Sequence, residues 1–169
     1  MIREEVNTVI KGKSFEYEGY FSYSDLIILV DSFFKKNGYT KTILNHSELV
    51  KENGKEIKLR MRPSKNKKGS KLEVQVWLTI KKMVNVVKKV DGLNININKG
   101  KISIVVDAYF ISDVRGKWEA KPEYTFIKTI FEKFLFSGKS KDYAGWVTKD
   151  ANDFIDEIRS HLNLHKYVF

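Results

Sequence analysis

The sequence predicts a single α+β domain over residues 1–169: an antiparallel β-meander of five to six strands, with one helix after the first strand and two C-terminal helices packed on the sheet. Three observations predict this class. Apolar and polar residues alternate with period two through the middle of the chain, whereas apolar residues recur at helical spacing on either side of it. The chain is 169 residues long and contains no linker rich in Pro, Gly and Ser, which suits one domain.

The first strand and the first helix are predicted near the N-terminus. An aromatic segment, residues 15–21, is typical of a strand. Ser22 and Asp25 resemble a capping box, and Gly38 supplies a helix stop, so we expect a helix over residues 24–37. A helix that is apolar on more than one face is buried inside its domain or against a partner, and burial within the domain is favoured here. Its apolar residues are Leu26, Ile27, Ile28, Leu29, Val30, Phe33 and Phe34.

Alternating segments in the middle of the chain predict the sheet. Such alternation puts one face of each strand on the core and leaves the other at least partly in water. The segments are 57–62, 72–80, 93–98 and 102–110, with 40–50 as an additional strand.

Turn signals separate these segments. Asp91–Gly92 and Lys99–Gly100 both suit two-residue hairpin turns. We expect Pro63 through Gly69 to form the loop of a hairpin in which residues 57–62 pair with residues 72–80.

Two helices are predicted at the C-terminal end. Pro122 suits the first turn of one helix, which Gly138 ends, and Thr148 suits the N-cap of the other. The apolar stripe of the first is Ile127, Ile130, Phe131, Phe134 and Leu135, and that of the second is Ala151, Phe154, Ile155, Ile158 and Leu162.

This order of elements resembles the helix-grip fold of the START and Bet v 1-like superfamily, in which a curved antiparallel sheet wraps a long C-terminal helix. The resemblance is one of topology and covers most of the chain. Short phrases are also similar to an uncharacterised group of small archaeal proteins, which implies no activity. These phrases are residues 17–21, 37–39, 98–100, 115–119 and 162–164.

Several functional classes are excluded or disfavoured. The chain has no Cys, so thiolate nucleophiles, Cys-ligated metals and disulfides are absent. The N-terminus lacks a signal pattern and no apolar run is long enough to span a membrane, so we expect a cytoplasmic protein. No phosphate-binding loop, dinucleotide fingerprint or hydrolase motif occurs, which favours a non-enzymatic protein without a cofactor.

Isolated titratable residues give weak signals for a site. His161 and His165 lie one helical turn apart, but further metal ligands are not evident, and two ordinary histidines are favoured. His46 has no identifiable partner for acid–base chemistry. Asp107 interrupts an apolar strand; an outward-facing side chain is favoured over a buried, paired one.

A basic segment, residues 55–71, is the best functional signal. It holds eight Lys and Arg residues against one Glu, and so carries +7 of the chain's net charge of +10. Basic side chains beside an exposed Trp can contact phosphates and stack on a base, whereas a solubilising loop would have the same composition. The candidate nucleic-acid-binding residues are Lys58, Arg60, Arg62, Lys65, Lys67, Lys68, Lys71 and Trp77.

We therefore predict a protein that docks on RNA or a ribonucleoprotein through this segment. One alternative is a carrier of a small apolar ligand, with Phe126, Phe131, Phe134 and Tyr109 lining a pocket. Another is an assembly component that meets a protein partner through the apolar helix at 24–37 or through an edge of the sheet.

Overall fold

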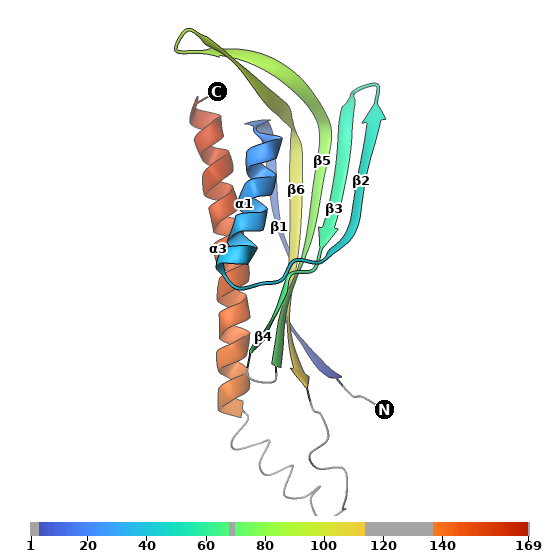
Figure 1. The fold of residues 1–169 in the computed structure, drawn as a ribbon, viewed down its shortest axis with the longest axis vertical. Coiled ribbons are helices and arrows are strands. Elements are labelled where there is room, and N and C mark those ends of the chain that lie inside the picture. Colours follow the sequence, from blue (N-terminus) through green and yellow to red (C-terminus); the bar gives the residue numbers. More distant parts are fainter. Residues whose placement is uncertain (1–3, 68–69, 114–136, 169) are drawn as a thin grey trace, which may run out of the picture.

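Two helices lie against one face of a six-stranded antiparallel sheet in the computed structural model, which describes residues 4–67, 70–113 and 137–168 (Figure 1). The predicted α+β class and antiparallel sheet are confirmed. The strands are β1 (Glu4–Phe21), β2 (Ile43–Lys51), β3 (Gly54–Met61), β4 (Ser64–Lys67), β5 (Ser70–Val90) and β6 (Leu93–Asp113), and the helices are α1 (Tyr23–Lys36) and α3 (Ser137–Val168).

The strand order is β1-β6-β5-β3-β2, with β4 also paired to β5. Strands β2, β3, β5 and β6 follow one another as a meander, and β1 joins at the β6 edge. The predicted pairing of residues 57–62 with 72–80 is confirmed, since Ile57 lies opposite Ile80 and Met61 opposite Val76.

The loop predicted over Pro63–Gly69 is wrong in its first part, because residues 64–67 form β4 and pair with residues 70–73. Pro63 interrupts the edge only locally. It has no N–H to donate, but its carbonyl accepts a hydrogen bond from the Val74 amide at 2.9 Å. The chain therefore resumes pairing with β5 directly after the proline.

Of the two predicted hairpin turns, only the first is confirmed. Asp91 and Gly92 have φ values of 49° and 81°, as a tight turn with two left-handed residues requires. The turn at Lys99–Gly100 is wrong, since β6 runs straight through it. Gly100 serves a close approach instead: a Cβ there would lie 2.9 Å from the Lys81 carbonyl oxygen.

The C-terminal helix begins earlier than predicted. Helix α3 starts at Ser137, so Gly138 does not end a helix there and Thr148 does not begin one; the Thr148 hydroxyl donates to the Ala144 carbonyl within the helix. Tertiary packing overrides the propensity cost of about 1 kcal/mol for each helical Gly. The helix predicted from Pro122 lies almost entirely outside the described residues. The predicted apolar stripe is confirmed, with Ala151, Phe154, Ile155, Ile158 and Leu162 all at most 1% exposed.

Helix α1 is capped and buried as predicted. The Ser22 hydroxyl accepts from the Asp25 amide at 3.3 Å. The ring of Phe34 lies 4.8 Å from that of Phe154, centroid to centroid, which joins α1 to α3. Ile28, on the opposite side of the helix, is 64% exposed. The buried residues of α1 are Leu26, Val30, Phe33 and Phe34.

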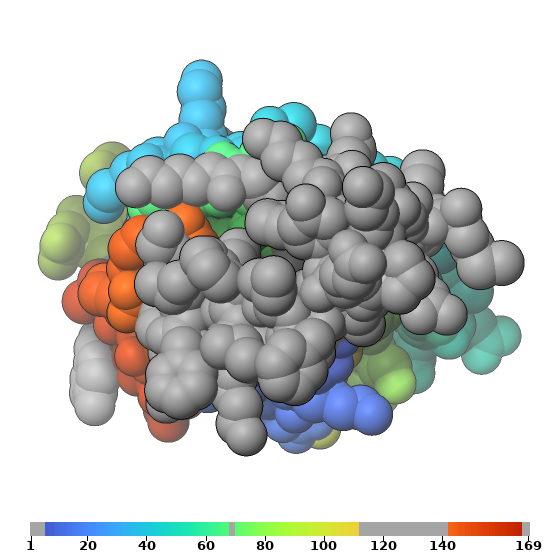
Figure 2. Space-filling model, turned by 90° about the horizontal axis from the view of Figure 1, so that it is seen from below, coloured from blue at the N-terminus to red at the C-terminus, as the bar shows by residue number. Residues whose placement is uncertain are grey.

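The helices cover only part of the sheet. Helix α3 packs on β1, β5 and β6. Seen from below, its orange-to-red atoms lie on one side of the molecule and the teal atoms of β2 and β3 on the other (Figure 2). Every residue of β2 is exposed. Among the described residues, no helix combines the length and the apolarity needed to cross a membrane.

Candidate nucleic-acid interface

The outer face of the sheet, which is the face turned away from α1 and α3, carries the basic side chains of β3. Along β3, buried Ile57, Leu59 and Met61 alternate with Lys58 and Arg60, which are exposed. The helices cover the buried set, so the cations point the other way. The predicted exposed basic strand face is thus present.

Arg60 and Trp77 form the centre of this face. They are cross-strand partners on β3 and β5, and the guanidinium carbon of Arg60 lies 5.2 Å from the centre of the Trp77 ring. An Arg over an indole is attracted by its π-electrons. Trp77 is half-buried and lies between Val76 and Leu78, which are buried on the helix side, so its ring is on the outer face and does not pack under α1.

Glu56 is held between two lysines on the outer face. Lys51 binds one carboxylate oxygen, and the ammonium of Lys58 lies 3.1 Å from the other. The Glu56 side chain is only 11% exposed. Hydrogen bonds lower the pKa of Glu56 to about 2, with the larger effect from Lys51 and the smaller from Lys58. One carboxylate with two cations leaves this cluster with a net charge of +1.

Glu73 repeats the arrangement further along the sheet. Its carboxylate lies 3.2 Å from Arg62 Nε and 3.1 Å from Lys71 Nζ, and its side chain is 6% exposed. The two cations are 39% and 43% exposed. Both acidic groups therefore lie beneath cations that water or a ligand can reach. The sequence analysis missed the two carboxylates, although strand alternation places Glu56 on the same face of β3 as Lys58, and Glu73 on the same face of β5 as Trp77.

Lys65 and Lys67 are not part of the outer face. The ammonium of Lys65 donates to Asp150 of α3 at 2.6 Å and to the Asn37 carbonyl at 3.2 Å. Tyr39 also donates to Asp150, at 2.8 Å, and burial followed by this hydrogen bond raises the pKa of the Tyr39 phenol. The ammonium of Lys67 lies 3.6 Å from the centre of the Trp146 ring. These two lysines attach β4 to α3, and Lys65 also attaches it to the segment that follows α1. Lys68 lies outside the described residues.

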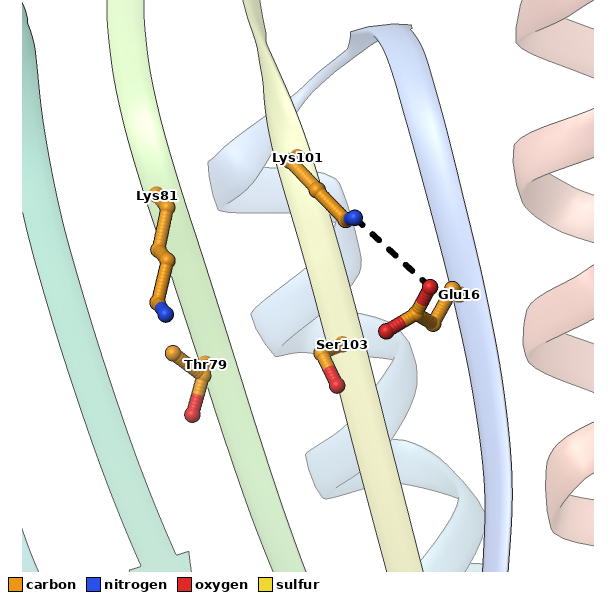
Figure 3. Close-up of a pocket in the computed structure, with 5 residues that line it drawn as sticks. All are labelled: Glu16, Thr79, Lys81, Lys101 and Ser103. Atoms are coloured by element: carbon orange, nitrogen blue, oxygen red, sulfur yellow. Dashed lines mark ion pairs between the residues drawn. The ribbon is translucent and has the colours of Figure 1, made fainter.

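A shallow depression of about 250 Å³ lies on the outer face (Figure 3). It is next to Lys58, whose cross-strand partner Thr79 lines it. In Figure 3 its side chains stand in front of the strands while α1 passes behind them. The ammonium of Lys101 lies 3.6 Å from a carboxylate oxygen of Glu16. The sequence analysis did not single out these residues, although strand alternation assigns them to one face. The depression is lined by Glu16, Thr79, Lys81, Lys101 and Ser103.

The histidines show no metal-binding geometry. The rings of His161 and His165 lie 4.6 Å apart, and His165 Nδ1 lies 3.0 Å from the His161 carbonyl oxygen. Burial, followed by the nearby His165, lowers the pKa of His161. His46 faces Glu48 at 3.5 Å on exposed β2. Within the described part of the chain, no three His, Asp or Glu side chains are grouped to hold a metal ion.

Asp107 lies on the outer face and is paired there. One carboxylate oxygen accepts from the Gly12 amide at 2.6 Å and the other from the Tyr109 hydroxyl at 3.0 Å. These bonds fasten the irregular part of β1 to β6. Tyr109 therefore lies opposite the helix-covered core and does not line an interior pocket. The three phenylalanines proposed with it, Phe126, Phe131 and Phe134, lie outside the described residues.

Comparison of the chain with protein-family models, curated proteins and solved structures gave no significant match.

Proposed function

We propose that the outer face of the sheet binds single-stranded RNA, with the Trp77 ring stacking on a base and the surrounding cations contacting phosphates. The observation that carries the proposal is the Arg60–Trp77 pair at the centre of the antiparallel surface that the two described helices, α1 and α3, leave uncovered. Single-stranded nucleic acid is commonly bound by aromatic rings within a basic groove or sheet, because every base offers a face for stacking.

The charge on this face supports the proposal. The Glu56 and Glu73 carboxylates are almost buried, and each is accompanied by two cations that remain partly exposed. A polyanion approaching the face meets ammonium and guanidinium groups before it meets the carboxylates. Neutralising those cations with phosphates releases counterions from the RNA, which favours binding at low salt.

The test is a salt titration of the binding of the full chain to a single-stranded RNA of about 12 nucleotides, followed by fluorescence anisotropy. Trp77→Ala is expected to weaken binding by about 1–3 kcal/mol through the loss of stacking. Lys58→Gln is expected to lower the salt dependence by about 0.7 in the log–log slope, the value for one phosphate contact on a single strand.

Lys67→Gln is the matched control, because it removes the same charge from the side of the sheet that faces α3. It is expected to leave the salt slope unchanged. Absence of binding by the wild-type chain at low salt, or equal losses from Lys58→Gln and Lys67→Gln, would contradict an interface on the outer face.

The two alternatives remain predictions. A carrier of the helix-grip type needs an enclosed apolar cavity, whereas the depression described above opens on the surface and is lined by polar side chains. Assembly through α1 would involve the exposed Ile28, since Leu26, Val30, Phe33 and Phe34 are buried within the chain.

A further inference from the structure

The depression on the outer face places two lysines directly opposite each other. Lys81 and Lys101 are cross-strand partners on β5 and β6. Like charges in such a pair destabilise a sheet unless an anion lies between them. Lys101 has Glu16 at 3.6 Å, whereas Lys81 has no carboxylate partner among the described residues. The depression therefore has an unbalanced positive charge.

Two hydroxyl groups complete the lining. Thr79 and Ser103 form the next cross-strand pair on the same face, and Figure 3 shows them beside the two lysines. A hydroxyl and an ammonium both donate hydrogen bonds, and several donors on one face of two neighbouring strands suit the several oxygens of a tetrahedral anion.

The backbone at this point has an irregular conformation. The β5–β6 register shifts directly after Lys81, and Lys82 has a φ of 54°, which is uncommon outside Gly. Gly100 allows the close approach, since its Cβ position lies 2.9 Å from the Lys81 carbonyl oxygen. Bulges of this kind re-aim side chains and are common next to functional sites. The bulge therefore fixes where Lys81 stands relative to Lys101.

We propose that this depression is a binding site for one phosphate group, held by the ammonium groups of Lys81 and Lys101 and the hydroxyls of Thr79 and Ser103. The inference rests on the proposed function for the source of the phosphate, which is bound RNA. An internal phosphodiester and a 5′-terminal phosphate offer the same chemistry, and the experiment below distinguishes them.

The site itself is tested with inorganic phosphate, by following backbone amide resonances of the full chain at constant ionic strength. Saturable shifts at Thr79 and Ser103 are expected, and Lys81→Gln is expected to abolish them. Lys89→Gln, which removes an exposed cation from the distal part of the β5–β6 hairpin, is the matched control. Shifts that do not saturate, or that Lys81→Gln leaves unchanged, overturn the site.

RNA binding then identifies the source. Lys81→Gln is expected to lower affinity by about 5–10-fold at about 50 mM salt, the loss that one phosphate contact entails. Equal losses for RNA with a 5′-hydroxyl and with a 5′-phosphate identify an internal phosphodiester; a loss confined to the phosphorylated RNA identifies the terminal group. No loss with either RNA overturns the proposal.

The two proposals fail differently. If the chain binds no RNA but Lys81→Gln still removes saturable phosphate shifts, the RNA-binding function is wrong and the anion site stands. If Trp77→Ala weakens RNA binding while neither phosphate nor Lys81→Gln has an effect, the RNA-binding face stands and the anion site is wrong.

Discussion

Both halves of the basic segment carry several cations, but these cations have different roles. In β3, Lys58 and Arg60 point away from the helices and remain exposed. In β4, Lys65 and Lys67 contact Asp150 and Trp146 of α3. The first half can meet a polyanion, whereas the second holds the sheet to a helix.

The difference follows from the alternation of side chains between the two faces of a strand. Residues 58, 60 and 62 are even and share the outer face, while Lys65 pairs with buried Leu72 and so shares the face turned to α3. An unbroken alternation from β3 into β4 puts even and odd positions on opposite faces. A run of basic residues in the sequence therefore forms one charged surface only where its side chains lie on the same face of the sheet.

The largest difference between the two halves is expected when the packing of α3 is weakened. Ile158 is 1% exposed, and Ile158→Ala is expected to destabilise the chain by about 2–5 kcal/mol because it leaves a cavity in the core. Urea unfolding measures this loss. Hydrogen exchange is expected to accelerate more at the amides of β4, which depends on α3, than at those of β3. An unchanged unfolding midpoint would mean that α3 is peripheral.

Removing one basic side chain from each half tests the comparison directly. Lys65→Met is expected to cost about 1–3 kcal/mol, because the Asp150 carboxylate, 14% exposed, loses this cation and, among the described residues, keeps the Tyr39 hydroxyl as its hydrogen-bond donor. Arg60→Met, on the exposed face, is expected to change stability by no more than about 0.5 kcal/mol. Chemical denaturation of both variants measures the difference. Equal effects would mean that Lys65 is not a structural residue.

The smallest effect concerns the pH dependence of the outer face. The pKa of Glu56 is about 2 in the folded chain against an ordinary value of 4.5. Its ionised form therefore stabilises the fold fully above pH 4.5, and this contribution is lost as the pH falls from 4.5 toward 2. Glu56→Gln is expected to remove that part of the acid sensitivity.

Urea unfolding of the wild type and Glu56→Gln at several acidic pH values measures the contribution. The stability gap between them is expected to narrow as the pH falls. Glu18→Gln removes an exposed carboxylate of β1 and controls for the loss of one negative charge. A gap that stays constant with pH would mean that Lys51 and Lys58 do not hold the carboxylate.

Local patterns in the sequence determined most of the elements. Alternation gave the strands, Ser22 and Asp25 gave the start of α1, Asp91–Gly92 gave the hairpin turn, and helical spacing gave the stripe that α3 buries. Each of these patterns involves residues within a few positions of one another, so the sequence alone is enough to predict the corresponding element.

Only the tertiary structure decided the rest. Gly100 lies inside β6 because Lys81 of the neighbouring strand approaches it, and α3 passes through Gly138 because its apolar stripe packs on the sheet and α1. The outer face likewise depends on β1, β3, β5 and β6, which bring Glu16, Lys58, Lys81 and Lys101 together from distant parts of the chain. Long-range packing supplies these contacts, and local sequence preferences are too weak to determine them.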